Sequence, residues 1–253
     1  MTRRVVITGA ASGIGLEIAQ QFIALGDQVA ICDVSQSALD EVKKDIPEIK
    51  AHRCDVSDPQ SLEAFFLYVE ETFGGVDVFI SNAGTAGPAG AIDEMAFDDW
   101  QNCLNVNLNG AFCGCQWAAR HMKRQKSGVI LIMSSTSGLF GVPNRSPYVA
   151  AKWGLIGLMK GLAIELGAHN IRVNAICPGA VEGARMDKVL EIESAATGKS
   201  KDALKDIYTQ GVSLRRFVTA DEIAQMACYL ASDAARSISG QGISVDGNTE
   251  RMV

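Results

Sequence analysis

Short runs of apolar, β-branched residues alternate along the chain with longer segments in which apolar residues recur at helical spacing. The first run covers residues 5–7, and a helical pattern follows over residues 13–25. This alternation predicts strands and helices in turn, and therefore a parallel sheet with helices on both faces. The strands are almost continuously apolar, as expected for strands that are covered on both faces. Further strands are predicted at residues 28–32, 49–54, 76–80, 129–133, 171–176 and 242–245, and further helices from residue 36, after residue 59, and over residues 97–123, 148–167 and 220–231.

No domain boundary, internal repeat or low-complexity linker interrupts this series. We therefore expect an α/β protein with one Rossmann-type, doubly wound domain of about seven strands spanning residues 1–253. Residues 181–211 are the exception, because they are polar, contain Gly183 and Gly198, and are long for a connection between elements. Such segments are usually binding loops or lids, so we expect a substrate-binding lid there.

Composition narrows the classes of partner. The chain of 253 residues is 47% hydrophobic and 21% charged, which allows a sizeable core. Its net charge of −6 argues against a nucleic acid or an anionic membrane as partner. The start of the chain does not resemble a signal peptide, and no stretch reaches the ~18 apolar residues of a membrane span. We expect a soluble, cytoplasmic protein.

Cysteine and histidine usage gives no sign of a metal centre. The seven cysteines are odd in number and form no CxxC pair, and the three histidines are far apart in sequence. These spacings favour reduced, buried thiols over disulfides, and they predict no metal site.

A glycine-rich turn follows the first predicted strand. Residues 8–15 read TGAASGIG, which places Gly9, Gly13 and Gly15 between a strand and a helix. Such glycines permit a tight turn, close approach of the backbone to a pyrophosphate, and close packing of helix on strand. The start of the helix adds N–H groups and the positive end of its dipole. We therefore expect a dinucleotide site rather than only a tight turn, with Ser12 and Ile14 contributing to it.

Asp33 ends the second predicted strand, at the distance from the glycine turn that is typical of a ribose-binding acid. A carboxylate there accepts hydrogen bonds from the adenosine ribose and repels a 2′-phosphate. The glycine turn holds no lysine or arginine, and Val34 and Ser35 are neutral, so we favour NAD over NADP. Asp55 and Val56 follow the third strand and would meet the adenine, although an ordinary helix-capping role fits Asp55 equally well.

Tyr148 and Lys152 are four residues apart in a segment predicted to be helical, so their side chains share one face. An ammonium within about 4–6 Å of a phenol favours the phenolate and lowers the phenol pKa from about 10. The phenol then donates and accepts protons near neutral pH, as general acid–base catalysis requires. Taken alone, the pair indicates a solvated helix face more often than a catalytic pair. Ser135, at the end of the fifth predicted strand, adds a hydroxyl that can donate to a substrate oxygen.

Together these segments resemble the short-chain dehydrogenase/reductase (SDR) family. The resemblance covers essentially the whole chain, and its motifs occur in order and at family-like spacing. The motifs are the glycine turn of residues 8–15, Asn82-Ala83-Gly84, Asn107 within residues 105–108, Ser135, Tyr148, Lys152 and Pro178-Gly179.

The resemblance implies a role for each matching residue. Tyr148 would be the general acid/base on the substrate oxygen, and Lys152 would lower its pKa and hold the nicotinamide ribose. Ser135 would polarise the substrate carbonyl or hydroxyl, and Asn107 would hold a water that links Lys152 to solvent. The cofactor groove would be completed by Asn82, Ala83, Gly84, Pro178, Gly179 and Val181.

Structural roles remain open for three of these segments: Asn107 as a tie between strand and helix, residues 82–84 as sheet support, and residues 178–179 as a chain turn. The chain also departs from the family pattern after Gly179. The family often places a Thr there that contacts the nicotinamide carboxamide, whereas this chain has Val181 followed by Glu182. That contact must come from the backbone or from another hydroxyl.

The predicted function is an NAD-dependent oxidoreductase that interconverts a secondary alcohol and a ketone by hydride transfer. We expect a small polar, sugar-like or acid-bearing alcohol. Arg145 and Arg185 could clamp a carboxylate or another anionic group, although surface roles fit both arginines as well. Other candidates for the substrate pocket are Gly87, Pro88, Thr136, Leu139, Asn144 and Met186.

Two alternatives are weighed against this function. The first is an NADPH-dependent ketoreductase of the 3-oxoacyl thioester type, against which Asp33 argues. The second is a non-enzymatic nucleotide-sensing module, which has no reason to carry Ser135, Tyr148 and Lys152 together. The family resemblance also implies a homotetramer whose main interface is formed by the helices predicted at residues 97–123 and 148–167.

Overall fold

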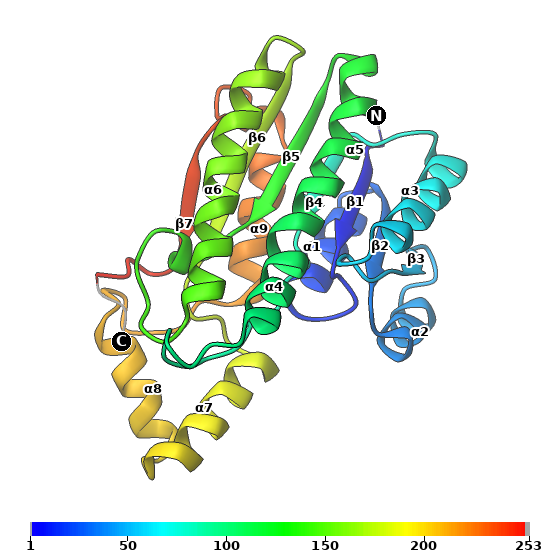
Figure 1. Cartoon of the computed structure of the whole chain (residues 1–253). Helices are drawn as coiled ribbons and strands as arrows, with labels where there is room; N and C mark the ends of the chain where they lie inside the picture. Colours follow the sequence, from blue (N-terminus) through cyan, green and yellow to red (C-terminus); the bar gives the residue numbers. More distant parts are fainter. Residues whose placement is uncertain (1, 251–253) are drawn as a thin grey trace.

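The computed structural model describes residues 2–250, apart from the side chains of Arg185, Ile192, Glu193, Ala196 and Thr197. Its centre is a parallel sheet of seven strands in the order β3-β2-β1-β4-β5-β6-β7 (Figure 1). This is the Rossmann-type α/β fold that the alternating pattern predicts. The strands are β1 (Arg4–Thr8), β2 (Gln28–Asp33), β3 (Lys50–Arg53), β4 (Val78–Ser81), β5 (Gly128–Met133), β6 (Ile171–Pro178) and β7 (Gly242–Val245).

The strand order reverses between β1 and β4. From β1 the chain builds outward through β2 and β3, and it then returns to pair β4 with the other side of β1. The connections on either side of this point leave the sheet in opposite directions, which opens a crevice beyond the carboxyl ends of the two strands. The sheet therefore places its ligand crevice beside the glycine turn.

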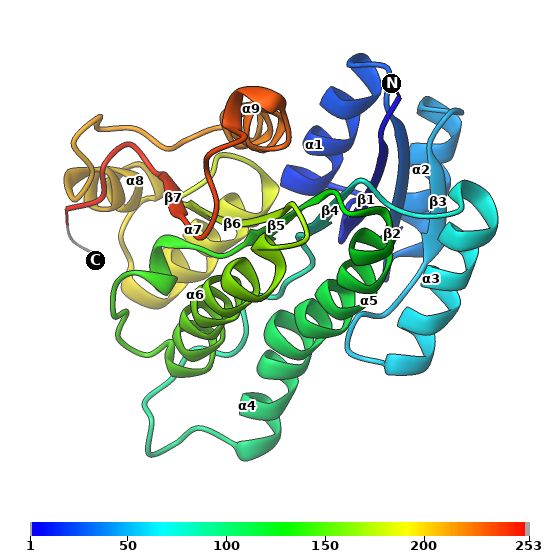
Figure 2. The same ribbon diagram turned by 90° about the horizontal axis from the view of Figure 1, so that it is seen from above.

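Helices cover both faces of the sheet. Figure 2 shows α1 and α9 on one side and α3, α5 and α6 on the other. No helix in the described part of the chain is long and apolar enough to cross a bilayer. The helices are α1 (Gly13–Ala24), α2 (Gln36–Asp45), α3 (Pro59–Phe73), α4 (Phe97–Leu104), α5 (Gly110–Gln125), α6 (Ser146–Gly167), α7 (Ala184–Thr197), α8 (Lys201–Gln210) and α9 (Ala220–Leu230).

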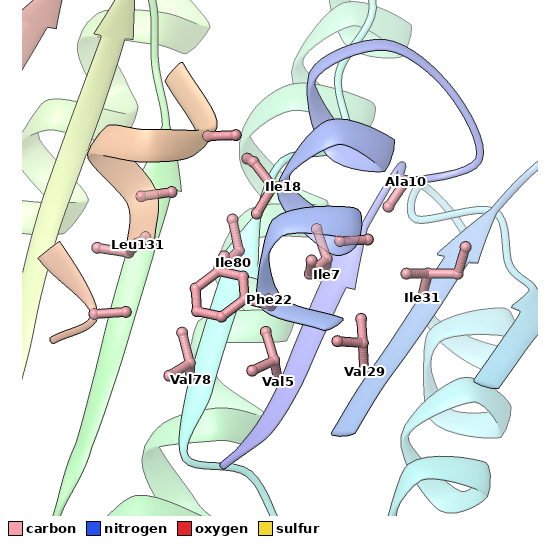
Figure 3. Close-up of a cluster of buried hydrophobic side chains, with 14 of the residues drawn as sticks. Val5, Ile7, Ala10, Ile18, Phe22, Val29, Ile31, Val78, Ile80 and Leu131 are labelled. Carbon is pink, nitrogen blue, oxygen red and sulfur yellow. The ribbon is translucent and has the colours of Figure 1, made fainter. Parts of the chain in front are cut away.

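Two apolar cores lie on the two faces. Val5 and Ile7 of β1 point into the core with α1 and α9, whereas Val6 between them points into the core with α3, α5 and α6. In the first core, Ile18 and Phe22 of α1 pack over strands β1 and β4 (Figure 3). Successive strand residues face opposite sides, so a strand buried on both must be apolar at nearly every position. This explains the continuous apolar runs in the sequence.

The helix predicted over residues 97–123 is not regular. It consists of α4 and α5 joined by a π-helical turn at Asn105–Asn109. A π-helical turn holds one more residue than an α-helical turn and is frequent at functional sites. Apolar periodicity does not reveal one extra residue, so the prediction missed it.

The predicted lid contains two helices, α7 and α8, which lie together at one end of the molecule (Figure 1). Leu190 of α7 and Leu204 of α8 are buried in a small cluster of their own with Phe217. This cluster is separate from the two cores of the sheet, so the pair of helices has an apolar centre of its own.

Gly114 sets how closely α5 approaches β4. A Cβ at this position would lie 2.4 Å from Cζ of the buried Phe79 ring. We expect Gly114→Ala to lower the free energy of unfolding by about 1–3 kcal/mol, because α5 must move away from β4. Urea unfolding followed by circular dichroism measures this change.

The matched control is Gly167→Ala at the exposed end of α6, where a Cβ would meet nothing within 4 Å. This variant should be as stable as the parent or more stable by up to about 1 kcal/mol, because alanine restricts the unfolded chain more than glycine does. Equal unfolding midpoints for the two variants would contradict the packing assigned to Gly114.

Candidate active site

A cavity of about 1010 Å³ lies beyond the carboxyl ends of the strands, at the upper end of the range for ligand pockets. It extends from the glycine turn, past the ends of β2 and β4, to the start of α6 and the lid helices. Every residue assigned a cofactor-binding or catalytic role in the sequence lines this cavity, and of the two arginines expected to clamp an anionic substrate, only Arg145 does so. The side chain of Arg185 lies outside the described residues.

The glycine turn is tied directly to the end of β4. Gly9 has a positive φ of 62°, and a Cβ there would lie 2.6 Å from Cα of Ala83, so only glycine fits. The side-chain amide of Asn82 donates to the carbonyl oxygens of Thr8 (3.1 Å) and Gly9 (2.7 Å). In return, Oγ1 of Thr8 accepts from the backbone N–H groups of Asn82 and Ala83. Residues 82–84 therefore hold the turn in place as well as lining the cavity.

The start of α1 is suited to an anion. Ser12 is the N-cap with extended backbone, but its side chain makes no capping hydrogen bond, and the first turn carries no acidic residue. Ser12, Gly13, Ile14 and Gly15 all line the cavity. The positive end of the helix dipole and its N–H groups thus face the place where a pyrophosphate would lie.

Asp33 lines the cavity next to the glycine turn. Its carboxylate accepts hydrogen bonds from the backbone N–H of Ala11 (3.1 Å) and of Ser35 (3.1 Å), which fixes its orientation. Arg53 lies at the same strand end, and its guanidinium donates to the carbonyl of Val34 at 3.3 Å. A carboxylate at the position of Asp33 can accept hydrogen bonds from ribose hydroxyls.

Asp55 and Val56 also line the cavity, but Asp55 is engaged in a local turn. Its Oδ1 accepts from the backbone N–H (2.9 Å) and the hydroxyl (2.6 Å) of Ser57. Beside them, contact with Cys32 lowers the pKa of the Cys54 thiol, whereas burial raises the pKa of Cys32. All seven cysteines are free thiols, and five of them are buried.

Tyr148 and Lys152 lie one turn apart on α6 and both face the cavity. The Lys152 side chain is only 4% exposed, and its Nζ donates to the carbonyl oxygen of Met133 at 3.0 Å. Nζ lies 5.5 Å from the centroid of the Tyr148 ring. The ammonium is thus held between the end of β5 and the phenol, because a buried charge requires polar partners.

The end of β5 is joined to α6 by a second contact. The hydroxyl of Ser134 donates to the backbone carbonyl of Lys152 at 2.9 Å. Ser135 begins a short 3₁₀ turn, and its Oγ accepts from the N–H of Ser137 at 3.1 Å. Since that Oγ acts as the acceptor, its own hydrogen remains available to donate into the cavity.

Asn107 lies within the π-helical turn and is 1% exposed. Its side-chain N–H group donates to the carbonyl of Cys103 at 2.9 Å, which directs its Oδ1 away from Cys103. Oδ1 is buried and accepts no hydrogen bond from the described residues. A Cβ at Gly84 would lie 2.8 Å from Oδ1 and 3.5 Å from Nζ of Lys152. The glycine therefore leaves an acceptor and an ammonium facing the same small space, which fits a bridging water.

The segment after β6 closes the cavity. The N–H of Gly179 donates to Val245 of β7 at 3.0 Å, and Val181 pairs with Val218. Pro178, Gly179 and Val181 line the wall, as the sequence predicts.

The sequence missed several cavity residues. Tyr208 of α8 and Thr249 near the C-terminus belong to the wall, and Thr249 is brought there by a bridge with Val212. No local sequence motif predicts that residues of these distant segments line the cavity. Ser134 could have been found, because it precedes Ser135 at the same strand end.

Among the other candidates, Thr136 and Met186 line the cavity, but Gly87, Pro88, Leu139 and Asn144 do not. The loop with Gly87 packs on α4 instead, since a Cβ at Gly87 would lie 2.6 Å from Sγ of Cys103. Within the described part of the chain, no three acidic, histidine or cysteine side chains are grouped as a metal would require.

Comparison with known proteins supports this view of the fold. A family model described as enoyl-(acyl carrier protein) reductase matches residues 9–248. D-beta-hydroxybutyrate dehydrogenase of Rhizobium meliloti is 31% identical over 256 residues, which cover 98% of this chain and 98% of that protein.

Two solved structures are similar over nearly the whole length. An actinorhodin polyketide ketoreductase with NADPH has a TM-score of 0.94 and 33% identity, covering 99% of this chain and 98% of that one. An NAD⁺-bound xylitol dehydrogenase has a TM-score of 0.91 and 26% identity, covering 97% and 98%. The parallel sheet, the cavity with its Tyr148–Lys152 pair, and these matches show that the chain belongs to the short-chain dehydrogenase/reductase family of oxidoreductases.

Proposed function

We propose that the protein is an NAD-dependent dehydrogenase that interconverts a secondary alcohol and a ketone, with Tyr148 as the general acid/base. The observation that carries this proposal is the buried Lys152 ammonium, anchored at 3.0 Å on Met133 and 5.5 Å from the Tyr148 ring. A cation held in this position stabilises the phenolate relative to the phenol. Tyr148 can then take the proton of an alcohol, or return it to a ketone oxygen.

The neighbouring residues support the same chemistry. Ser135 donates a hydrogen bond to the reacting oxygen and holds it beside Tyr148. Asn107 offers an acceptor near Lys152, through which a water can connect the ammonium to solvent. The nicotinamide cofactor, when bound, supplies the acceptor or donor of the hydride. The glycine turn, Asp33, Asn82 and the segment 178–181 would hold that cofactor along the cavity.

NAD is favoured over NADP by the carboxylate of Asp33 at the ribose end of the cavity. The alternative, an NADPH-dependent ketoreductase of the 3-oxoacyl thioester type, is favoured by the similarity to a polyketide ketoreductase with NADPH and by Arg53 beside Val34. Arg53, however, donates to a backbone carbonyl and does not line the cavity, whereas Asp33 lines it and is held by two backbone N–H groups.

The substrate proposed is a small polar, sugar-like or acid-bearing secondary alcohol. Similar proteins include a D-beta-hydroxybutyrate dehydrogenase and an NAD⁺-bound xylitol dehydrogenase. Hydroxybutyrate and xylitol are small and polar, which supports a substrate of this size and polarity. Met186, Val189 and Tyr208 would enclose the substrate from the lid.

We also propose a homotetramer. Large apolar side chains are exposed on the outer surfaces of α4, α5 and α6, where water would otherwise cover them; they are Phe97, Phe112, Trp153 and Ile164.

Tyr148→Phe should reduce turnover by at least about 10²-fold, because the variant has no group to exchange a proton with the substrate oxygen. NADH should still bind, since the phenyl ring preserves the wall of the cavity. Steady-state absorbance of NADH measures turnover, and NADH fluorescence titration measures binding. Turnover similar to that of the parent protein would end the proposal for Tyr148.

Asp33→Ser should change the cofactor preference. The parent should bind NADH more tightly than NADPH, and the variant should lose about 10- to 100-fold of that preference, because a charged acceptor is removed. Fluorescence titration with both cofactors gives the ratio of dissociation constants.

Asp45→Ser, an exposed position at the end of α2, is the matched control and should leave the ratio unchanged. A parent protein that binds NADPH at least as tightly as NADH would favour the ketoreductase alternative.

A further inference from the structure

Arg145 occupies the end of the cavity where the substrate reacts. It is the N-cap residue of α6, half-buried, and part of the cavity wall. Its Cζ lies 5.3 Å from the centroid of the Tyr148 ring. The preceding residue, Asn144, has a positive φ of 59°, and its carbonyl accepts from the N–H of Gly90 at 3.0 Å. The loop of Gly90 therefore fixes the backbone from which Arg145 reaches Tyr148.

No carboxylate among the described residues forms an ion pair with the guanidinium of Arg145. Three arginines of the described chain, Arg3, Arg4 and Arg216, each donate to both oxygens of a carboxylate. Arg53, Arg172 and Arg215 donate to backbone carbonyls instead. Arg145 contacts the face of Tyr148, and no carboxylate or carbonyl in the described residues accepts a hydrogen bond from it. A guanidinium has five N–H donors in a planar fork that matches a carboxylate or phosphate.

The charges around the cavity leave this end positive. Asp33 and Asp55 lie at the adenosine end, following β2 and β3. Glu182 also lines the cavity but is exposed, and it adds to the effect of Glu222, which raises the pKa of Arg216. The first turn of α6 carries no acidic residue. Lys152, the other cation among the described residues that line the cavity, donates to Met133 and lies beside Tyr148. An anion entering the reactive end therefore meets Arg145.

We propose that Arg145 binds an anionic group of the substrate, a carboxylate or a phosphate, next to the carbon that Tyr148 serves. The inference rests on the proposed function and narrows its substrate class to short hydroxy or keto anions. Since Arg145 lies against the Tyr148 ring itself, the anionic group must be only a few bonds from the reacting oxygen. A long acyl thioester would carry its charge too far away to reach both residues.

Matched pairs of ketones test the charge requirement. Acetoacetate and acetoacetamide have nearly the same shape and differ in the charge of one group. Dihydroxyacetone phosphate and dihydroxyacetone make the same comparison for a phosphate. The two pairs together show whether the protein prefers a carboxylate or a phosphate. For the parent protein, kcat/KM with NADH should be higher for an anionic member than for its neutral counterpart. Arg145→Gln should lower that anionic-to-neutral ratio about 10- to 100-fold, the loss expected for a hydrogen bond between charged groups.

Arg236→Gln, on an exposed turn after α9, is the control and should keep the ratio of the parent protein. An equal loss for anionic and neutral ketones in Arg145→Gln would overturn the proposal, because it would mean that Arg145 only positions Tyr148. A parent protein without preference for either anion would overturn it too.

Binding provides a readout that does not depend on turnover. Calorimetric titration of the NADH-loaded Tyr148→Phe protein with acetoacetate and with dihydroxyacetone phosphate should show affinity for at least one of them that Arg145→Gln removes. If neither binds more tightly than its neutral counterpart, the role of Arg145 is wrong even where the parent oxidises alcohols. If Arg145-dependent binding is found but Tyr148→Phe turns over normally, the anion site stands and the proposed catalytic role of Tyr148 fails.

Discussion

The close approach of β1 and β4 at their carboxyl ends is the constraint on which the rest of the site depends. Glycine at position 9 lets the backbone of the first turn lie against Ala83, and the Asn82 amide bonds both carbonyls that the turn exposes. A larger side chain at position 9 would force the two strand ends apart. The contact thus fixes the floor of the crevice, and the start of α1 and the loop after β4 take their positions from it.

A second set of contacts fixes the catalytic helix. Two hydrogen bonds cross between the end of β5 and α6: Lys152 donates to Met133, and Ser134 donates to the backbone of Lys152. One uses the charged side chain and the other the helix backbone, so the helix can neither slide nor rotate without breaking one of them. The position of Tyr148 over the cavity follows from this attachment, since it lies one turn before Lys152 on the same face.

Much of this arrangement was predictable from the sequence because the signals are local. Strands buried on both faces are apolar throughout, and a turn such as residues 8–15 requires glycine for steric reasons. The parallel sheet then brings the ends of distant strands together, which is why Asp33, Ser135 and Gly179 could be assigned to one cavity. The π-helical turn was missed because one additional residue leaves the apolar pattern almost unchanged. Tyr208 and Thr249 were missed because their positions depend on how the lid and the C-terminal segment pack. Packing between segments that are distant along the chain produces no recognisable pattern in the sequence of either segment.

The π-helical turn has a consequence for how the chain can vary. Asn105–Asn109 winds one residue more than an α-helical turn, and each residue rotates a helix by about 100°. Loss or gain of a single residue between α4 and α5 would therefore swing Cys103 and the rest of α4 around the helix axis, away from Asn107 and from the loop of Gly87. The number of residues in this helix is therefore fixed by the position that Asn107 must reach beside Lys152.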